Sequence, residues 1–358
     1  MRRNLYYFFS LFVLIFFILI LDLLLSNTVL NYKNCFKYEE FYYELKKNCR
    51  SSYRFKSSFP ITETITDEMG LRIGKNTPPK NKNKKNIFIF GDSFTYGVGL
   101  EYDKTFVGLI EREKKDYNIF NFGVGSYSPS VYLYKLKNYL NNNVIPEKIL
   151  VFLDLTDVLD EALRWEYNRK LNIVKLPTKE IYEKSFKQEE FIKRNFKLLT
   201  NLFSYFNYHL REFKEKKKIK TQNERKIKTS IQGSFTYTDS NLLDERFWKK
   251  GMFEYGIDKL EKTLIEIANI SKENNSDFYI IIYPWAETLE FGQEKFNWSE
   301  FVKKLCVNQC EVINAIPSFM SYKDQNINWS NELYFLNDEH FNEKGASLLY
   351  KTVIKNIN

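Results

Sequence analysis

The stretch Asn86–Gly97, NIFIFGDSFTYG, decides the fold of this chain. Ile87–Phe90 is a short apolar run of the kind that forms a fully buried strand, and it stops abruptly at Gly91-Asp92-Ser93. A serine on a tight turn after a buried strand is where an α/β protein presents a nucleophile, because ligands collect outside the carboxyl ends of parallel strands. Turn chemistry also allows a simpler interpretation, in which Asp92 and Ser93 only cap a helix.

Beyond this stretch, short apolar segments alternate with segments of helical periodicity, which is typical of a parallel sheet with helices on both faces. The expected strands are 87–90, 117–122, 148–154, 278–283 and 311–315. The expected helices are 105–113, 131–140, 255–272, 301–306 and 344–357. The sequence therefore predicts an α/β fold, with residues 86–358 as one domain.

The N-terminus has the pattern of a membrane anchor. An uncharged apolar run extends from Leu5 to Leu21 and continues after Asp22 to Leu25, close to the roughly 20 residues that cross a bilayer as a helix. Because Arg2 and Arg3 precede the run, residues 1–26 are expected to form a cytoplasmic tip and a single span of the cell membrane, with the domain on the outer or periplasmic side. A cleaved signal peptide is the alternative, although no small-residue cleavage site follows the run.

Two further segments lie outside the alternating pattern. Residues 27–85 form a membrane-proximal lead-in, with a short helix expected at Phe36–Leu45 and an extended segment, Ile61–Gly74, that turns at Gly70. Residues 158–246 are polar, rich in lysine and mostly helical in propensity, so we interpret them as an insertion. Within the insertion, Arg211–Lys228 carries nine basic and three acidic residues.

The four cysteines are informative if the domain is exported, because disulfides persist in an oxidising compartment. Cys35 and Cys49 are near neighbours in sequence, as are Cys306 and Cys310, so two local bridges are the simplest pairing, and other pairings stay open. A metal site is not expected, because the only two histidines show no ligand spacing with these cysteines.

The net charge of +9 has two interpretations. It could attract an anionic partner such as a membrane surface or an acidic polymer. The lysines are spread widely and mixed with glutamate, which favours a general compositional bias. No nucleic-acid-binding module is recognisable in the sequence, so nucleic acid is not an expected partner.

A serine nucleophile needs a base to take its proton and an acid to orient that base. His209 lies in the aromatic, basic part of the insertion and is interpreted as an ordinary helix-face residue. His340 ends the segment Asn337-Asp338-Glu339-His340, beyond the final strand, where the topology brings it back to the sheet edge that carries Ser93. The alternative for His340 is a surface-loop histidine.

These residues resemble the motifs of a known family. GDSFTYG, NFGVG, the third strand and DEHFNEKG fall in the order of the conserved blocks of the SGNH, or GDSL-type, hydrolases, over residues 86–157 and 250–357. The resemblance implies a flavodoxin-like α/β/α sandwich without a metal or organic cofactor. It also implies Ser93 as nucleophile, His340 as general base and then acid, and Asp338 as the orienting acid. Many members place this aspartate three residues before the histidine, where this chain has Asn337.

The resemblance also locates an oxyanion hole. Ser126, with Gly125 just before it, takes the place of the glycine whose backbone N–H binds the oxyanion, together with the N–H of Ser93. Thr156 stands where the family usually has an asparagine, and losing one such donor costs about 100- to 1,000-fold in turnover. Structural residues expected near the site are Gly91, Asp92 and Asp157.

The reaction implied by the resemblance is acyl transfer at an ester through an acyl-Ser93 intermediate. The expected setting is the removal or addition of O-acetyl groups on a cell-envelope or extracellular polysaccharide. A lipid or small-ester hydrolase is the alternative among enzymes. From a different class, a catalytically impaired envelope protein that binds glycan is the other alternative.

Overall fold

The computed structural model describes residues 2–28, 34–55, 59–219, 251–292, 297–306, 310–336 and 338–357. Five parallel strands form its central sheet, and their order across the sheet is β7-β6-β8-β11-β12. In chain order this is 2-1-3-4-5, the flavodoxin-like arrangement, so the predicted fold class is confirmed. The strands are β6 (Lys85–Phe90), β7 (Tyr117–Asn121), β8 (Lys148–Leu153), β11 (Asp277–Ile282) and β12 (Glu311–Asn314).

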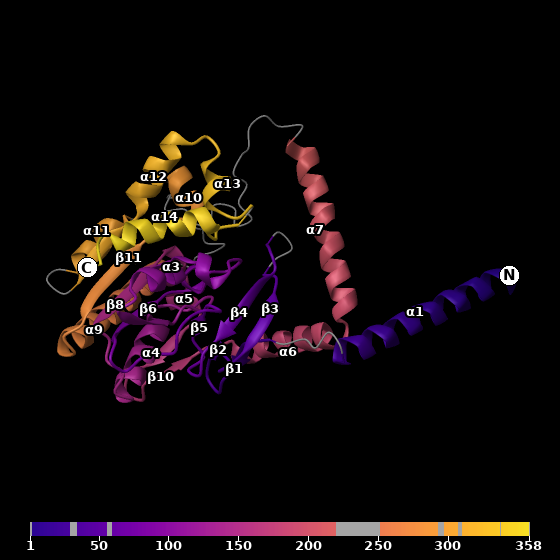
Figure 1. Ribbon diagram of the computed structural model, residues 1–358, viewed down its shortest axis with the longest axis horizontal. Coiled ribbons are helices and arrows are strands. Elements are labelled where there is room, and N and C mark those ends of the chain that lie inside the picture. Colours follow the sequence, from indigo (N-terminus) through magenta and orange to yellow (C-terminus); the bar gives the residue numbers. More distant parts are fainter. Residues whose placement is uncertain are drawn as a thin grey trace.

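Helices cover both faces of this sheet because alternate residues of each strand point to opposite sides. Phe88 and Phe90 pack with one group of helices, whereas Ile87 and Ile89 pack with the other, and all four are fully buried. The first group is α4 (Pro129–Asn141), α5 (Leu155–Leu163), α9 (Met252–Glu273) and α11 (Trp298–Leu305). The second group is α3 (Phe106–Glu113), α10 (Ala286–Phe291), α12 (Ile316–Gln325), α13 (Trp329–Leu333) and α14 (Glu343–Ile354). The three layers of the predicted sandwich are therefore present (Figure 1).

The described part of segment 27–85 forms two small antiparallel sheets. One is the hairpin of β1 (Phe36–Tyr38) and β2 (Tyr43–Leu45), so the expected helix at Phe36–Leu45 is wrong. The aromatic residues of this piece favour a strand, and the pairing of the two strands satisfies the backbone without helical bonds. The other sheet contains β3 (Arg50–Tyr53), β4 (Thr62–Thr66) and β5 (Arg72–Ile73), and the expected turn at Gly70 has a φ of 83°.

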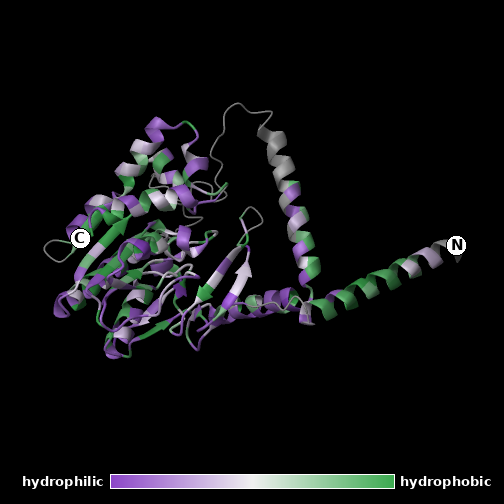
Figure 2. Ribbon diagram, in the orientation of Figure 1, coloured by the Kyte–Doolittle hydropathy of each residue, from purple (hydrophilic) through white to green (hydrophobic). Residues whose placement is uncertain are grey.

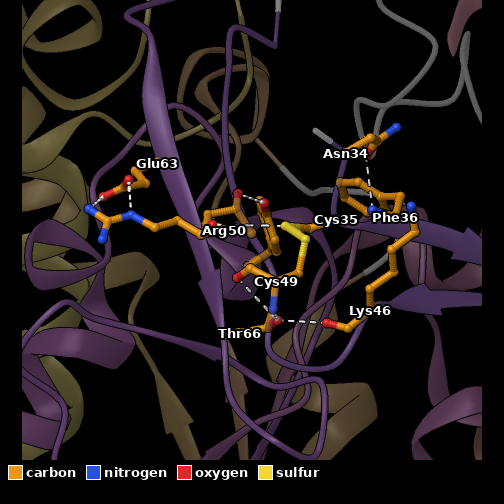
Figure 3. The surroundings of a disulfide bond; sticks show 10 residues. Asn34, Cys35, Phe36, Lys46, Cys49, Arg50, Glu63 and Thr66 are labelled. Carbon is orange, nitrogen blue, oxygen red and sulfur yellow. Dashed lines mark hydrogen bonds and ion pairs between the residues drawn. A yellow bond between two sulfur atoms is a disulfide. The ribbon is translucent and has the colours of Figure 1, made fainter. Parts of the chain in front are cut away.

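Both local disulfides of the simplest pairing form, Cys35–Cys49 and Cys306–Cys310. Figure 3 shows the first, which ties the β1–β2 hairpin to the sheet of β3, β4 and β5. Beside it, the hydroxyl of Thr66 accepts a hydrogen bond from the backbone N–H of Cys49 at 2.9 Å and donates one to the carbonyl of Lys46 at 2.6 Å. The bridge therefore holds the two small sheets together.

We expect the double replacement Cys35→Ser and Cys49→Ser to lower the free energy of unfolding by about 3 kcal/mol. The bridge closes a loop over a sequence separation of 14. A bridge across a loop of that length lowers the conformational entropy of the unfolded chain, and this stabilises the folded state by about 3 kcal/mol. Urea unfolding of the full chain under non-reducing conditions measures the change. The double replacement Cys306→Ser and Cys310→Ser is the matched comparison, and it should cost less because its sequence separation is 4.

The N-terminal helix α1 (Arg2–Thr28) projects away from the α/β body and is apolar along most of its length (Figure 2). Its segment Tyr6–Thr28 is the one helix among the described residues that is long and apolar enough to cross a membrane. Residues 158–163 belong to α5, which packs on the sheet, so the expected start of the insertion at 158 is too early. The insertion begins after Leu163 with the hairpin of β9 (Glu166–Asn168) and β10 (Ile173–Lys175) and continues as α6 (Lys179–Asn195) and α7 (Lys197–Ile219). The remainder of the insertion that falls in 220–246, with the end of Arg211–Lys228, lies outside the described residues.

Candidate active site

Ser93 is the first residue of the short helix α2 (Ser93–Tyr96), directly after strand β6. Asp92 caps this helix, because its side chain accepts a hydrogen bond from the backbone N–H of Phe94 at 2.9 Å. Asp92 thus caps the helix while Ser93 lies at the carboxyl end of the strand. The loop after α2 is held by Arg72, a buried residue that donates to the carbonyls of Gly97 at 2.9 Å and Leu100 at 2.6 Å.

The structure brings the three predicted triad residues together across a sequence separation of 247. The Nε2 atom of His340 lies 2.8 Å from the Oγ atom of Ser93. On the other side of the ring, Nδ1 lies 2.5 Å from Oδ1 of Asp338. The His340 and Asp338 side chains are 5% and 0% exposed, so bulk water is kept from the contact between them. This order of hydroxyl, imidazole and carboxylate is able to move a proton from the serine to the histidine.

The two-residue spacing between Asp338 and His340 is compatible with this geometry. Oδ1 of Asp338 accepts the backbone N–H of His340 at 3.0 Å, in addition to the contact with its ring. A tight Asx-type turn thereby folds the carboxylate back onto the imidazole. The ring of Phe94 packs against that of His340 in a tilted arrangement, with centroids 4.9 Å apart. Asn337, the position used by many family members, lies outside the described residues.

The surroundings of His340 act on its pKa in opposite directions. Burial lowers the pKa because it disfavours the charged imidazolium, whereas the hydrogen bond and negative charge of Asp338 raise it. The net result is a pKa of His340 above its usual 6.5. Asp338, Glu339 and His340 also offer ligand atoms within 4.8 Å of one another. Both ring nitrogens of His340 are engaged by Ser93 and Asp338, so a metal ion there would have to displace one of them.

Gly125 and Ser126 lie in the turn beside the serine. A Cβ atom placed on Gly125 would lie 3.9 Å from the Cβ atom of Ser93. The carbonyl of Gly125 accepts a hydrogen bond from the Tyr43 hydroxyl at 2.6 Å, and the carbonyl of Ser126 accepts one from Nε1 of Trp165 at 2.7 Å. Because the C=O and N–H of one planar peptide point in opposite directions, the N–H of Ser126 points away from Tyr43.

Three backbone N–H groups near Ser93 are available to bind a ligand. Within the described part of the chain, the N–H groups of Ser93, Gly125 and Ser126 donate to no protein acceptor. Ser126 has a φ of 57°, a left-handed conformation that is uncommon for a residue with a side chain. A non-glycine residue held in this conformation by two anchored carbonyls is the kind of strain that gathers at functional sites.

Thr156 does not have the arrangement expected of an oxyanion donor. Its hydroxyl donates to Oδ1 of Asp154 at 2.5 Å, and its backbone N–H donates to the same oxygen at 2.8 Å. A hydroxyl has one proton, so this bond leaves none for a substrate. Asp157, in turn, accepts the backbone N–H of Asp154 at 2.9 Å, which completes a capping box at the start of α5. The placement favours a structural role for Thr156.

We therefore expect Thr156→Val to lower stability and to leave turnover intact. The substitution keeps the shape of the side chain and removes a hydrogen bond that contributes about 1 kcal/mol to folding. The kcat per reactive serine, measured beside a melting curve, checks this expectation. A lower kcat at an unchanged melting temperature would contradict this expectation and would assign Thr156 to the oxyanion hole.

A group of buried acids lies behind Ser93. Oδ2 of Asp154 accepts hydrogen bonds from the Tyr283 hydroxyl at 3.1 Å and from Nε1 of Trp285 at 2.8 Å. Oδ2 of Asp92 lies 3.2 Å from Oγ of Ser93. Burial, and then the nearby charge of Asp154, raise the pKa of Asp92 to about 8. One side of the nucleophile therefore faces a buried carboxyl group whose pKa lies well above its usual range.

Several residues at the site were missed by sequence reasoning. Tyr43, Phe55 and Phe59 come from the segment interpreted as a lead-in, and the rings of Phe55 and Phe59 lie 5.5 and 6.3 Å from that of His340. No local pattern marks these three residues. Tyr283 could have been found, because it follows the fourth strand at its carboxyl end. His209 lies exposed on α7, with its ring 4.2 Å from that of Tyr205.

Comparisons with known proteins give structural similarity only. No family model matches the chain, and no curated protein matches it. A member of the lipolytic G-D-S-L family from Veillonella parvula is 12% identical and covers 76% of this chain and 98% of its own, with a TM-score of 0.42. A putative lipolytic protein of that family from Desulfitobacterium hafniense is 9% identical, with coverage of 76% and 99% and a TM-score of 0.40. The acetylxylan esterase Axe2 from Geobacillus stearothermophilus is 11% identical, with coverage of 77% and 95% and a TM-score of 0.40.

The fold and the site define the class of this protein: a three-layer α/β protein with a serine–histidine–aspartate triad at the carboxyl ends of its strands. The sequence motifs resemble those of the SGNH, or GDSL-type, hydrolases. Because the TM-scores lie below 0.5, the chemistry proposed below rests on the chain's own residues.

Proposed function

We propose that this protein is a membrane-anchored, outward-facing serine ester hydrolase or O-acyltransferase of the SGNH type. The observation that carries the proposal is the contact of Ser93 Oγ with His340 Nε2 at 2.8 Å, with Asp338 on the other nitrogen of the ring. The resemblance of the sequence motifs, which run in the family's order, supports the same assignment.

In the first half of the proposed reaction, Oγ of Ser93 attacks the carbonyl carbon of an ester while Nε2 of His340 takes its proton. The carbonyl oxygen becomes an oxyanion, which the N–H groups of Ser93, Gly125 and Ser126 are placed to receive. Asp338 stabilises the imidazolium that forms. The tetrahedral intermediate then collapses, the bond to the alcohol breaks, and His340 gives its proton to the leaving alkoxide.

In the second half, an incoming hydroxyl removes the acyl group from Ser93. His340 takes a proton from this hydroxyl as it attacks the acyl carbon, and returns the proton to Oγ of Ser93 as the acyl–serine bond breaks. Water as the incoming group gives hydrolysis, and a sugar hydroxyl gives transfer of the acyl group. The same residues serve both outcomes, so exclusion of water from the site decides between them.

The proposed substrate class is an O-acylated, in particular O-acetylated, polysaccharide of the cell envelope or extracellular space. Support comes from the N-terminal span and the two disulfides, which fit a domain exposed outside the cytoplasm. The two-residue spacing of Asp338 and His340 is similar to that in the family's membrane-linked polysaccharide acetyltransferases, and this similarity favours the same substrate class.

Labelling of the purified full chain with a fluorophosphonate tests the proposal, because this reagent reacts with an activated serine and mimics the tetrahedral intermediate. We expect one label, on Ser93, and its loss in His340→Ala. An unlabelled protein that still binds acetylated glycan would instead be a catalytically impaired glycan-binding protein.

We also expect Tyr43→Phe to lower kcat about tenfold with little change in KM. The Tyr43 hydroxyl holds the carbonyl of Gly125, and its loss frees the peptide that carries the N–H of Ser126. An oxyanion donor acts on charge that develops in the transition state, so its disorder affects kcat rather than substrate binding. Steady-state kinetics on an acetate ester measures both constants. A change confined to KM would assign Tyr43 to substrate binding instead.

A further inference from the structure

Asp22 is the one acidic residue within the apolar run of α1, and the structure gives it a partner. Its side chain is 2% exposed and accepts hydrogen bonds from the Ser26 hydroxyl at 2.8 Å and from the backbone N–H groups of Leu198 and Leu199, each at 2.9 Å. These N–H groups belong to the first turn of α7, where no helical carbonyl is available to them. The end of the apolar helix therefore caps the start of α7.

This contact places the first turn of α7 beside Asp22, near the C-terminal end of α1. A helix rises about 1.5 Å per residue, so Asp22 lies about 24 Å from Tyr6, near the far boundary of a hydrocarbon core about 30 Å thick. In Figure 1, α7 runs at a steep angle to α1 from their junction. If α1 crosses the bilayer, α7 therefore starts at the outer boundary and extends along the membrane surface.

One face of α7 is apolar and exposed. Its apolar residues follow helical spacing, at positions 199, 202, 203, 206 and 210. Phe203 is 70% exposed, Phe206 56% and Leu210 55%. Large apolar side chains gathered on one exposed helix face mark a contact surface in a folded protein. In Figure 2, α7 carries both apolar and polar residues, unlike the nearly uniform α1.

We propose that α7 lies in the outer surface of the bilayer that α1 crosses, with the apolar face of 199–210 at the boundary of headgroups and acyl chains. The proposal rests on the membrane-spanning role proposed for α1. An amphipathic helix with aromatic residues on its apolar face binds a lipid surface in this way. Because Asp22 joins the start of α7 to the helix that is proposed to span the bilayer, lipid rather than a protein is favoured as the partner of this apolar face. The catalytic body is then tethered at two points, and its height above the membrane is set by the Asp22 contact.

The full-length chain, reconstituted in vesicles of phosphatidylethanolamine and phosphatidylglycerol, allows a direct test. A photoreactive side chain is introduced as Phe206→p-benzoylphenylalanine, and the matched control is Asn201→p-benzoylphenylalanine. Asn201 is also exposed, and it lies about 140° around the helix axis from Phe206 at 100° per residue. We expect light to couple lipid to the first variant, with loss of the lipid adduct in the second.

Adducts from Phe206 to protein, within the chain or in a second copy, would overturn the proposal, as would equal lipid adducts at both positions. Release of the protein from the vesicles by alkaline carbonate would also overturn it, because α1 would then not span the bilayer. Equal melting temperatures of the two variants confirm that both are folded. Ester hydrolysis is measured on the same samples, so failure of the proposed reaction is distinguished from failure of the membrane contact.

Discussion

Ser93→Ala is expected to lower the kcat of ester hydrolysis by about 10³- to 10⁶-fold. The substitution removes the only atom of Ser93 that contacts Nε2 of His340, at 2.8 Å, and leaves no nucleophile for the acyl group. The remaining activity would come from the backbone N–H groups and from substrate binding alone. Hydrolysis of a chromogenic acetate ester by the purified chain, with a melting curve beside it, measures the effect and shows whether the fold is retained.

The double variant Ser93→Ala with His340→Ala sharpens this test. Triad members act as one unit, so the double variant should be no less active than either single variant. If the two losses multiplied instead, Ser93 and His340 would be acting independently, and the proposed proton transfer between them would be wrong. Retention of fluorophosphonate labelling in Ser93→Ala would place the nucleophile elsewhere in the chain.

Asp338→Asn is expected to lower kcat by about 10²- to 10⁴-fold and to shift the acid limb of the pH profile to lower pH. His340 must be neutral to accept the serine proton, so activity rises with pH through its pKa. In the wild-type chain the Asp338 carboxylate raises that pKa above 6.5. Asparagine removes the charge that stabilises the imidazolium, so the pKa falls and the limb moves with it. The dependence of kcat/KM on pH, compared between the two proteins, checks the sign.

The matched control for this prediction is Asn337→Ala, because many SGNH hydrolases have the aspartate at that position. It should leave activity close to that of the wild-type chain. If Asn337→Ala were damaging and Asp338→Ala harmless, the assignment of the orienting acid would be wrong. Asn337 lies outside the described residues, so the assignment of Asp338 rests on its own two contacts with His340.

The sequence alone determined the central sheet and the edge, at the carboxyl ends of its strands, where the candidate site lies. Strands such as Ile87–Phe90 are buried on both faces, so each appears in the sequence as a continuous apolar run. Such a run can be recognised from its own residues, without knowledge of the neighbouring strands. The regular alternation of strands and helices then implies a parallel sheet, whose strand ends meet at one edge. The same rule predicts that Ser93 and His340 lie at one edge of the sheet.

The tertiary structure decided what depends on partners distant in the chain. The piece Phe36–Leu45 forms a hairpin because its aromatic residues favour strands and β1 pairs with β2, and the bridge from Cys35 to Cys49 joins this hairpin to the next sheet. The hydroxyl of Tyr43 donates to the carbonyl of Gly125 at a sequence separation of 82, because the fold brings that acceptor near. Asp22 likewise found its donors in α7, at a sequence separation of 176 and 177, and no local pattern encodes a contact of that range.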